Sequence, residues 1–283
     1  MLSTLFLTAV SANTCQEKDL NCQEQAEENR SNKYTKPNPN AAQTERKMPS
    51  PIILNSTPAD SPQALVVFLH GLGDTGEGWS MAFKQPNLRN SKIKYIFPTA
   101  DQMPVTLNAG FRMNSWFDLY SLSPNTEEDT EGIKKAHDKL TTLIDEHLAQ
   151  HPNLSYKNVI LGGFSQGGAL AFYTAFNRIT IANNAENPEN NLYGGVFGLS
   201  TWLPLRDHFL KDENKILKEM KNTKVFQGHG DEDAVVPFPF GQLTSKIIKQ
   251  SSLESQFKSY RGMQHSSCEE EMGDVKVFIE QFV

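Results

Sequence analysis

The segment "NVILGGFSQGGALAFYTAF", residues 158–176, places one serine, Ser165, between two pairs of glycines. An apolar run precedes the glycines, and a pattern typical of a helix follows them. Glycine inside a regular element costs about 0.5–1 kcal/mol relative to alanine, so four glycines this close together need a structural reason. A sharp turn with positive φ and crowded neighbours supplies one, because it lifts the serine hydroxyl into a site.

The pentapeptide Gly163-Phe164-Ser165-Gln166-Gly167 fits G-x-S-x-G, the nucleophile elbow. It lies between a predicted strand and a predicted helix, which is the context that the motif requires. The first N–H groups of that helix favour negative charge developing at the site. The motif therefore predicts Ser165 as a nucleophile; the alternative is a glycine-rich turn with an idle serine.

Composition excludes several classes of protein. The chain has 283 residues, 38% of them hydrophobic and 21% charged, as in a globular protein, and its net charge of -6 argues against a nucleic-acid partner. No apolar run approaches the roughly 20 residues that span a bilayer. Three cysteines, Cys15, Cys22 and Cys268, contain no C-x-x-C pair. We expect free thiols, or at most a bridge between the first two, and no metal site.

The composition changes near residue 48. Residues 13–48 are dominated by Gln, Glu, Asn, Lys and Pro, so we expect residues 1–48 to form a disordered N-terminal extension. Within it, residues 1–12 resemble a signal peptide, with a short apolar stretch and a small-residue cleavage pattern, but they lack a basic n-region. The folded catalytic domain is predicted to span residues 49–283.

Within that domain, short apolar runs alternate with amphipathic stretches. The runs are continuous, as in strands that are covered on both faces. This alternation predicts a mostly parallel α/β sheet with its ligand site beyond the carboxyl ends of the strands. The expected strands are 64–70, 93–98, 158–163, 194–200, 223–230 and 256–260, and the expected helices include 133–148, 167–177 and 238–250.

A serine nucleophile needs a base, and in this fold the order along the chain is Ser, Asp or Glu, His. Order and position select His265, which lies in a loop between a predicted strand and the terminal helix. The other six histidines have structural explanations. We expect His137, His147 and His151 to be solvated, and His70 and His229 to bond the backbone at strand ends. His208 is expected to cap a helix.

The acid should lie between serine and histidine in the chain. The loop "GHGDEDAVVP" offers Asp231, Glu232 and Asp233 directly after a predicted strand. A buried carboxylate that accepts from the histidine Nδ1–H fixes its tautomer and stabilises the imidazolium. The residues themselves indicate only that this loop carries the acid.

The segment Gly71-Leu72-Gly73-Asp74-Thr75-Gly76 offers a competing interpretation. It matches G-x-G-x-x-G after a predicted strand, which is the dinucleotide-binding fingerprint. However, the acid expected about 20 residues later, at the end of the next strand, is missing. In a hydrolase the same loop supplies a backbone N–H to the oxyanion hole, and the residue after the nucleophile supplies the second. We favour the hydrolase.

Several motifs in order resemble the acyl-protein thioesterase/lysophospholipase family, the small carboxylesterases of the α/β-hydrolase fold. The resemblance covers residues 49–283. The matching pieces are "FLHGLGDTGEGW", "VTLNAGFRMNSWFDLYSLSP", "EDTEGI", "LGGFSQGGALAFYTA", "GLSTWLPLR", "QGHGDEDAVVP" and "GMQHSSCEEEM".

The resemblance implies a role for individual residues. The catalytic serine, acid and histidine fall on Ser165, Asp233 and His265, and the oxyanion N–H groups on Leu72 and Gln166. An acyl chain would lie along a loop that contains Leu107, Phe111 and Trp116, together with Met113. These apolar side chains could instead pack onto the core.

The resemblance also implies the activity. Family members hydrolyse thioesters of palmitoylated proteins and esters of lysophospholipids or short acyl chains, without metal or cofactor. We therefore expect an acylated protein or lysophospholipid substrate, transient contact with a membrane surface and a cytoplasmic location, with secretion as the alternative. A short-chain carboxylesterase, a dinucleotide-binding protein and a non-catalytic binding module are the alternative functions. No motif indicates the oligomeric state.

Overall fold

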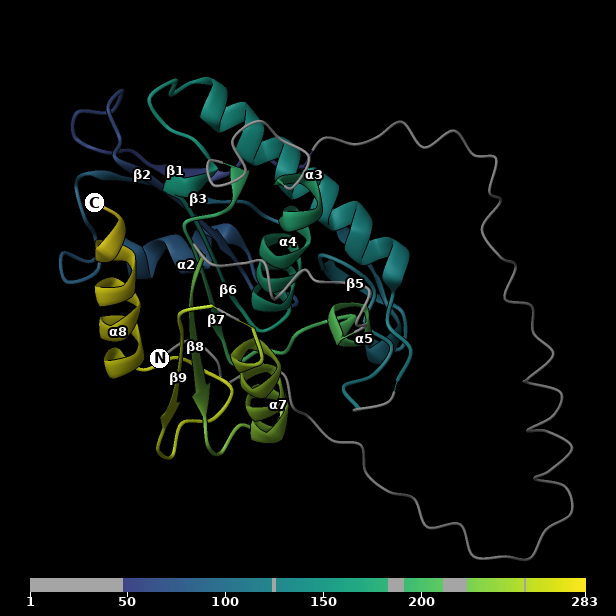
Figure 1. The fold of residues 1–283 in the computed structure, drawn as a ribbon. Coiled ribbons are helices and arrows are strands. Elements are labelled where there is room, and N and C mark those ends of the chain that lie inside the picture. The colour runs from purple at the N-terminus through teal and green to yellow at the C-terminus, as the bar shows by residue number, and fades with distance from the viewer. Residues whose placement is uncertain (1–47, 124–125, 183–190, 211–222, 252) are drawn as a thin grey trace, which may run out of the picture. The chain divides into compact units, whose positions relative to one another are not determined.

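The computed structural model describes residues 48–283 except 124–125, 183–190, 211–222 and 252. In this part of the chain the central sheet has seven strands in the order β1-β3-β2-β6-β7-β8-β9, and every pairing except that of β1 with β3 is parallel (Figure 1). The strands are β1 (Ile52–Leu54), β2 (Ala64–Leu69), β3 (Ile93–Phe97), β6 (Val159–Phe164), β7 (Gly195–Leu199), β8 (Lys224–Gly230) and β9 (Ser255–Tyr260).

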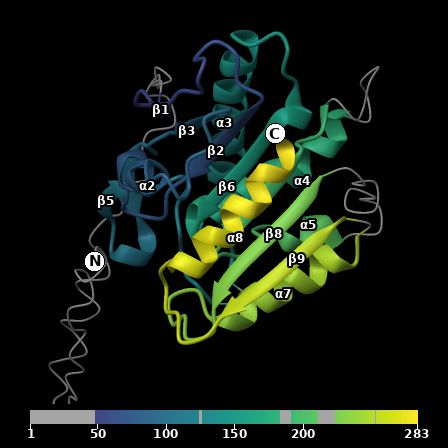
Figure 2. The same ribbon diagram turned by 90° about the vertical axis from the view of Figure 1, so that its left-hand side faces the viewer.

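Helices cover both faces of this sheet. One face packs against α3 (Thr130–Ala149), α4 (Gln166–Ala182), α5 (Arg206–Leu210) and α7 (Phe238–Lys249), and the other against α2 (Gly76–Phe83) and α8 (Glu269–Ile279). Figure 2 shows α8 in front of the strands, with α4, α5 and α7 behind them. Short 3-10 helices occupy Thr106–Asn108, Tyr156–Asn158 and Glu280–Phe282. The predicted α/β-hydrolase architecture is confirmed.

Strand β2 shows why its sequence is continuously apolar. Leu65 and Val67 belong to the core beneath α3 and α4, whereas Val66 and Phe68 belong to the core beneath α2 and α8. Because successive side chains of a strand point to opposite faces, a strand covered twice needs apolar residues at every position. The strand boundaries agree with the predicted ones to within one residue.

The strand β1 was not predicted, and neither were two further features. The segment expected to form an acyl-binding loop folds into a hairpin of β4 (Gln102–Val105) and β5 (Phe111–Asn114). Helix α2 follows the first glycine-rich loop. Its Gly76 lies so close to β3 that a Cβ there would be 2.3 Å from the carbonyl oxygen of Phe97. This close approach explains the third glycine of G-x-G-x-x-G without any nucleotide.

The prediction that three histidines are solvated was wrong, because His137, His147 and His151 are all buried. A His side chain can pack as a flat, neutral ring, and burial lowers the pKa of each, that of His147 to about 4. The Nζ of Lys94 on β3 lies 3.1 Å from Nε2 of His151 and can donate to it. His151 therefore contacts the sheet at β3, whereas His137 lies between α3 and α4, with its Nδ1 3.3 Å from Oγ1 of Thr174.

The predicted extension and its signal-like start lie outside the described residues, except for Met48, which packs against the core. Cys15 and Cys22 also lie outside them, and Cys268 is a free thiol. In the part of the chain that the structure describes, no helix is both long enough and apolar enough to cross a bilayer.

Candidate active site

The backbone at Ser165 is the strained turn that the glycines predicted. Its φ is +53°, in the left-handed region, and it connects the end of β6 to the start of α4. A Cβ on Gly163 would lie 2.4 Å from the backbone carbon of Gly167, and a Cβ on Gly167 would lie 2.3 Å from the carbonyl oxygen of Leu69. The glycines thus allow β6, α4 and β2 to approach closely around the serine.

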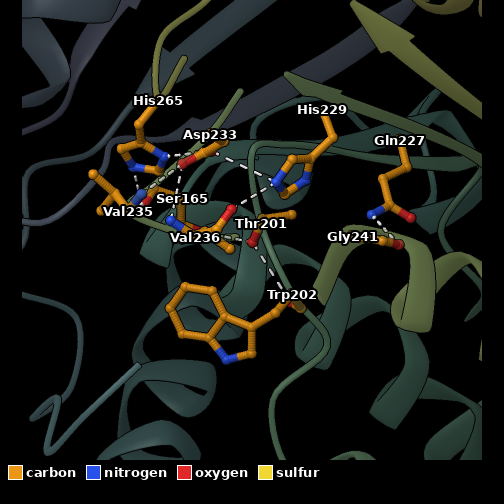
Figure 3. Close-up of polar contacts among 10 residues, drawn as sticks. All are labelled: Ser165, Thr201, Trp202, Gln227, His229, Asp233, Val235, Val236, Gly241 and His265. Atoms are coloured by element: carbon orange, nitrogen blue, oxygen red, sulfur yellow. Dashed lines mark hydrogen bonds and ion pairs between the residues drawn. The ribbon is translucent and has the colours of Figure 1, made fainter. Parts of the chain in front are cut away.

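Ser165, His265 and Asp233 form a continuous hydrogen-bonded chain (Figure 3). The Oγ of Ser165 is 3.0 Å from Nε2 of His265, and Nδ1 of His265 is 2.8 Å from Oδ2 of Asp233. A carboxylate only accepts hydrogen bonds, so Nδ1 must donate and Nε2 is left to accept from the serine hydroxyl. This tautomer is the one in which the imidazole can remove the serine proton.

The structure distinguishes among the three acids of the 231–233 loop. Asp233 is buried, and its Oδ1 accepts hydrogen bonds from the N–H groups of Val235 and Val236, both at 2.9 Å. Asp231 and Glu232 are exposed. The side chain of Asp231 instead accepts from the N–H of Gly262 at 2.6 Å, and so connects the acid loop to the loop that carries the histidine.

The three side chains come from three strand ends. Ser165 follows β6, Asp233 follows β8, and His265 lies between β9 and α8. Parallel strands end at the same edge of a sheet, which brings residues 100 positions apart into contact. The ring of Phe164 lies 4.8 Å from the imidazole of His265, centroid to centroid, and limits its movement.

The predicted oxyanion donors belong to segments that flank the serine. Leu72 lies in the turn after β2, and the preceding Gly71 is so close that its Cβ would be 3.5 Å from Cβ of Ser165. Gln166 is the first residue of α4, where backbone N–H groups have no intrahelical acceptor. The positive end of the α4 dipole also lies at Ser165.

The side chain of Gln166 has a role that the sequence did not reveal. Its Nε2 donates to the carbonyl of Phe117 at 2.8 Å, and its Oε1 accepts from the N–H of Trp116 at 3.1 Å. The indole N–H of Trp116 donates to the carbonyl of His70 at 2.8 Å. These bonds fix the segment after β5 against the serine elbow and the strand β2.

The predicted acyl-binding residues lie in different environments. Phe111 is 74% exposed and Leu107 42% exposed on the β4–β5 hairpin, where Met113 is half-buried. Trp116 is only 8% exposed and belongs to the core. The structure therefore leaves the two hairpin side chains exposed to solvent and buries the indole.

A cavity of about 780 Å³ is lined in part by residues of α3, α4 and α7. Phe117, Trp202, Val236 and Phe240 are among its lining residues, whereas Leu107, Phe111 and Trp116 are not. Two of its lining residues adjoin the site: Val236, whose N–H binds Asp233, and Trp202, which follows Thr201. Thr201 Oγ1 donates to the carbonyl of Ser165 at 2.6 Å.

The histidines assigned to structural roles do bond the backbone. Nδ1 of His70 donates to the carbonyl of Gly71, and its Nε2 accepts from the N–H of Ala100. Nε2 of His229 lies 2.9 Å from the carbonyl of Val236. Sequence reasoning missed Thr201 and the proximity of His229 to Asp233. The available signal was their position, because both stand at the carboxyl ends of buried strands.

The comparisons with known proteins agree with this arrangement. Residues 54–283 match the model of the phospholipase/carboxylesterase family. The chain is 38% identical over 230 residues to acyl-protein thioesterase 1 of Candida albicans, covering 79% of this chain and 94% of the relative. It is 34% identical over 237 residues to acyl-protein thioesterase 1 of Debaryomyces hansenii, covering 81% and 96%.

The solved structures give the same result. The crystal structure of Zea mays acyl-protein thioesterase 2 superposes with a TM-score of 0.69 at 30% identity, covering 82% of this chain and 98% of that one. The chain belongs to the phospholipase/carboxylesterase family and is a serine hydrolase of the α/β-hydrolase fold.

Proposed function

We propose that Ser165, His265 and Asp233 are the catalytic triad and that the protein hydrolyses acyl esters and thioesters through an acyl-enzyme. The unbroken chain of hydrogen bonds from Ser165 to Asp233 carries this proposal. His265 removes the serine proton as Oγ attacks the acyl carbonyl, and then passes that proton to the departing thiol or alcohol. Water, deprotonated by the same imidazole, releases the fatty acid and restores the serine.

The N–H groups of Leu72 and Gln166 receive the oxyanion in both steps. Their position beside the serine and at the start of α4 supports this assignment. Each such donor contributes about 2.7–4 kcal/mol to transition-state stabilisation in hydrolases of this kind. No metal or cofactor takes part in the proposed steps.

We propose an acylated protein or a lysophospholipid as the substrate. The names of the similar proteins support an acylated protein, and the exposed Leu107 and Phe111 offer apolar surface for a long acyl chain. Such a substrate brings the enzyme into transient contact with a membrane surface. A short-chain carboxylesterase is the second candidate, because burial of Trp116 removes the largest side chain of the expected acyl groove from direct contact.

Chain length separates the two candidates. Each buried methylene contributes about 0.8 kcal/mol, which is about fourfold in kcat/KM. We expect kcat/KM to rise from acetyl to long-chain acyl thioesters, and Phe111→Ala to flatten the rise. Val277→Ala, which removes a similarly exposed side chain from α8, should leave the profile unchanged. A flat wild-type profile would support the short-chain carboxylesterase.

We further propose a cytoplasmic location, which is the location that the resemblance to the acyl-protein thioesterases implies. N-terminal sequencing of the protein from its native source tests this proposal. An intact or Met-trimmed terminus supports it, and a mature chain that starts at Asn13 would show secretion instead.

A further inference from the structure

His229 lies on β8, four residues before Asp233, and its imidazole is fully buried. Its Nε2 is 2.9 Å from the carbonyl oxygen of Val236 and 3.5 Å from Oδ2 of Asp233. A carbonyl and a carboxylate only accept hydrogen bonds, so the proton of the neutral ring must be on Nε2. His229 thus directs an N–H at the turn that holds Asp233.

These contacts close a ring around the acid. Val236 donates its N–H to Oδ1 of Asp233 and accepts the Nε2–H of His229 on its carbonyl. Figure 3 shows Asp233 between two imidazoles, with His265 on one side and His229 on the other. Oδ2, the oxygen that binds His265 at 2.8 Å, is also the oxygen that faces His229.

The imidazole of His229 has little freedom to move. A Cβ on Gly241 of α7 would lie 2.5 Å from Nδ1, and the ring of Phe238 packs edge-on against the imidazole. The charged or titratable groups that face it are Asp233 and His265, and the contacts from α7 carry no charge. Burial lowers the pKa of His229, which keeps the ring neutral.

We propose that His229 is a positioning residue, whose Nε2–H fixes the turn at Val236 and with it the direction of the Asp233 carboxylate toward Nδ1 of His265. It touches no reacting atom and acts through Asp233, so the inference rests on the proposed triad. Without this N–H, the carboxylate can rotate away from His265 and stabilises the imidazolium less. The turnover number therefore falls.

Gln227 provides a matched control. It lies two residues earlier on β8, so its side chain is on the same face, and it is equally buried. Its Nε2 donates to the carbonyl of Gly241 at 3.0 Å, so it packs against the same helix. A change at Gln227 therefore measures the cost of disturbing the contact between β8 and α7 without altering the ring around Asp233.

The test compares His229→Gln with His229→Asn. The amide nitrogen of glutamine reaches about as far as the imidazole Nε2, whereas that of asparagine reaches only as far as Nδ1. We expect His229→Gln to retain most of the activity. We expect His229→Asn to lose about 10–100-fold in kcat, as misplaced catalytic groups do, with KM unchanged. A loss in kcat at constant KM that glutamine restores is a result that a purely structural role of His229 would not give.

Thermal melts of each variant show whether it is folded. If His229→Asn does not fold, Gly241→Ala displaces the imidazole from outside and should also lower kcat with KM unchanged. Equal kcat in His229→Gln and His229→Asn, or the same loss of kcat in His229→Asn and Gln227→Met, would overturn the inference. Turnover that survives Ser165→Ala would instead contradict the proposed triad, so the two failures are distinguishable.

Discussion

Asp233→Asn should abolish most of the activity while preserving the fold. The two N–H groups of Val235 and Val236 can only be satisfied by the amide oxygen of the new asparagine. Turning the amide the other way would place NH2 against two buried donors, and each unsatisfied group costs about 1–3 kcal/mol. The amide NH2 must therefore face Nδ1 of His265, which then has to accept instead of donate.

That reversal moves the imidazole proton to Nε2. A protonated Nε2 can no longer accept the proton of the Ser165 hydroxyl. A wrong tautomer in a serine hydrolase lowers kcat by about 10⁴, which is about 5.4 kcal/mol in activation free energy. The assay is thiol release from an acyl thioester, with the melting temperature measured alongside. Asp231→Asn is the control, because its amide oxygen can still accept from Gly262 and an exposed substitution should change kcat by about twofold. Equal losses at both positions, or a loss below tenfold for Asp233→Asn, would refute this reasoning.

Two further predictions concern stability. Gly167→Ala should lower the free energy of unfolding in urea by about 3 kcal/mol, because its Cβ would lie 2.3 Å from a backbone oxygen. Gly273→Ala should raise it by about 0.5–1 kcal/mol, because nothing lies within 4 Å of a Cβ on this helical glycine. If both substitutions changed the free energy of unfolding in the same direction, the close approach at Gly167 would not explain the effect of Gly167→Ala. Burial holds the pKa of His147 at about 4, below the ordinary 6.5, so the unfolded chain binds more protons between these values. Stability should therefore be complete above pH 6.5 and decline toward pH 4 by about 3 kcal/mol from this residue, a loss that His147→Leu should remove. If the stability of His147→Leu fell between pH 6.5 and pH 4 as much as that of the wild type, His147 would not be the cause of the loss.

The sequence was sufficient for the elements that local chemistry dictates. The strand β6, the elbow at Ser165 and the helix α4 follow from one apolar run, one set of glycines and one pattern typical of a helix. The position of His265 followed from chain order, because parallel strands bring their carboxyl ends to a common edge.

The rest depended on contacts between distant segments. Nothing in the local pattern around Trp116 indicates that Gln166, 50 residues away, binds its backbone and that the ring is buried as a result. The same holds for His147, whose place on α3 is compatible with a solvated or a buried ring until the position of Lys94 on β3 is known. Tertiary packing decides such cases.

The most direct test of the central claim, that Ser165 is the nucleophile, is labelling with an active-site fluorophosphonate followed by intact mass measurement. The folded wild type should gain one phosphonyl group, and Ser165→Ala should gain none. Equal labelling of the two proteins would contradict the assignment of Ser165.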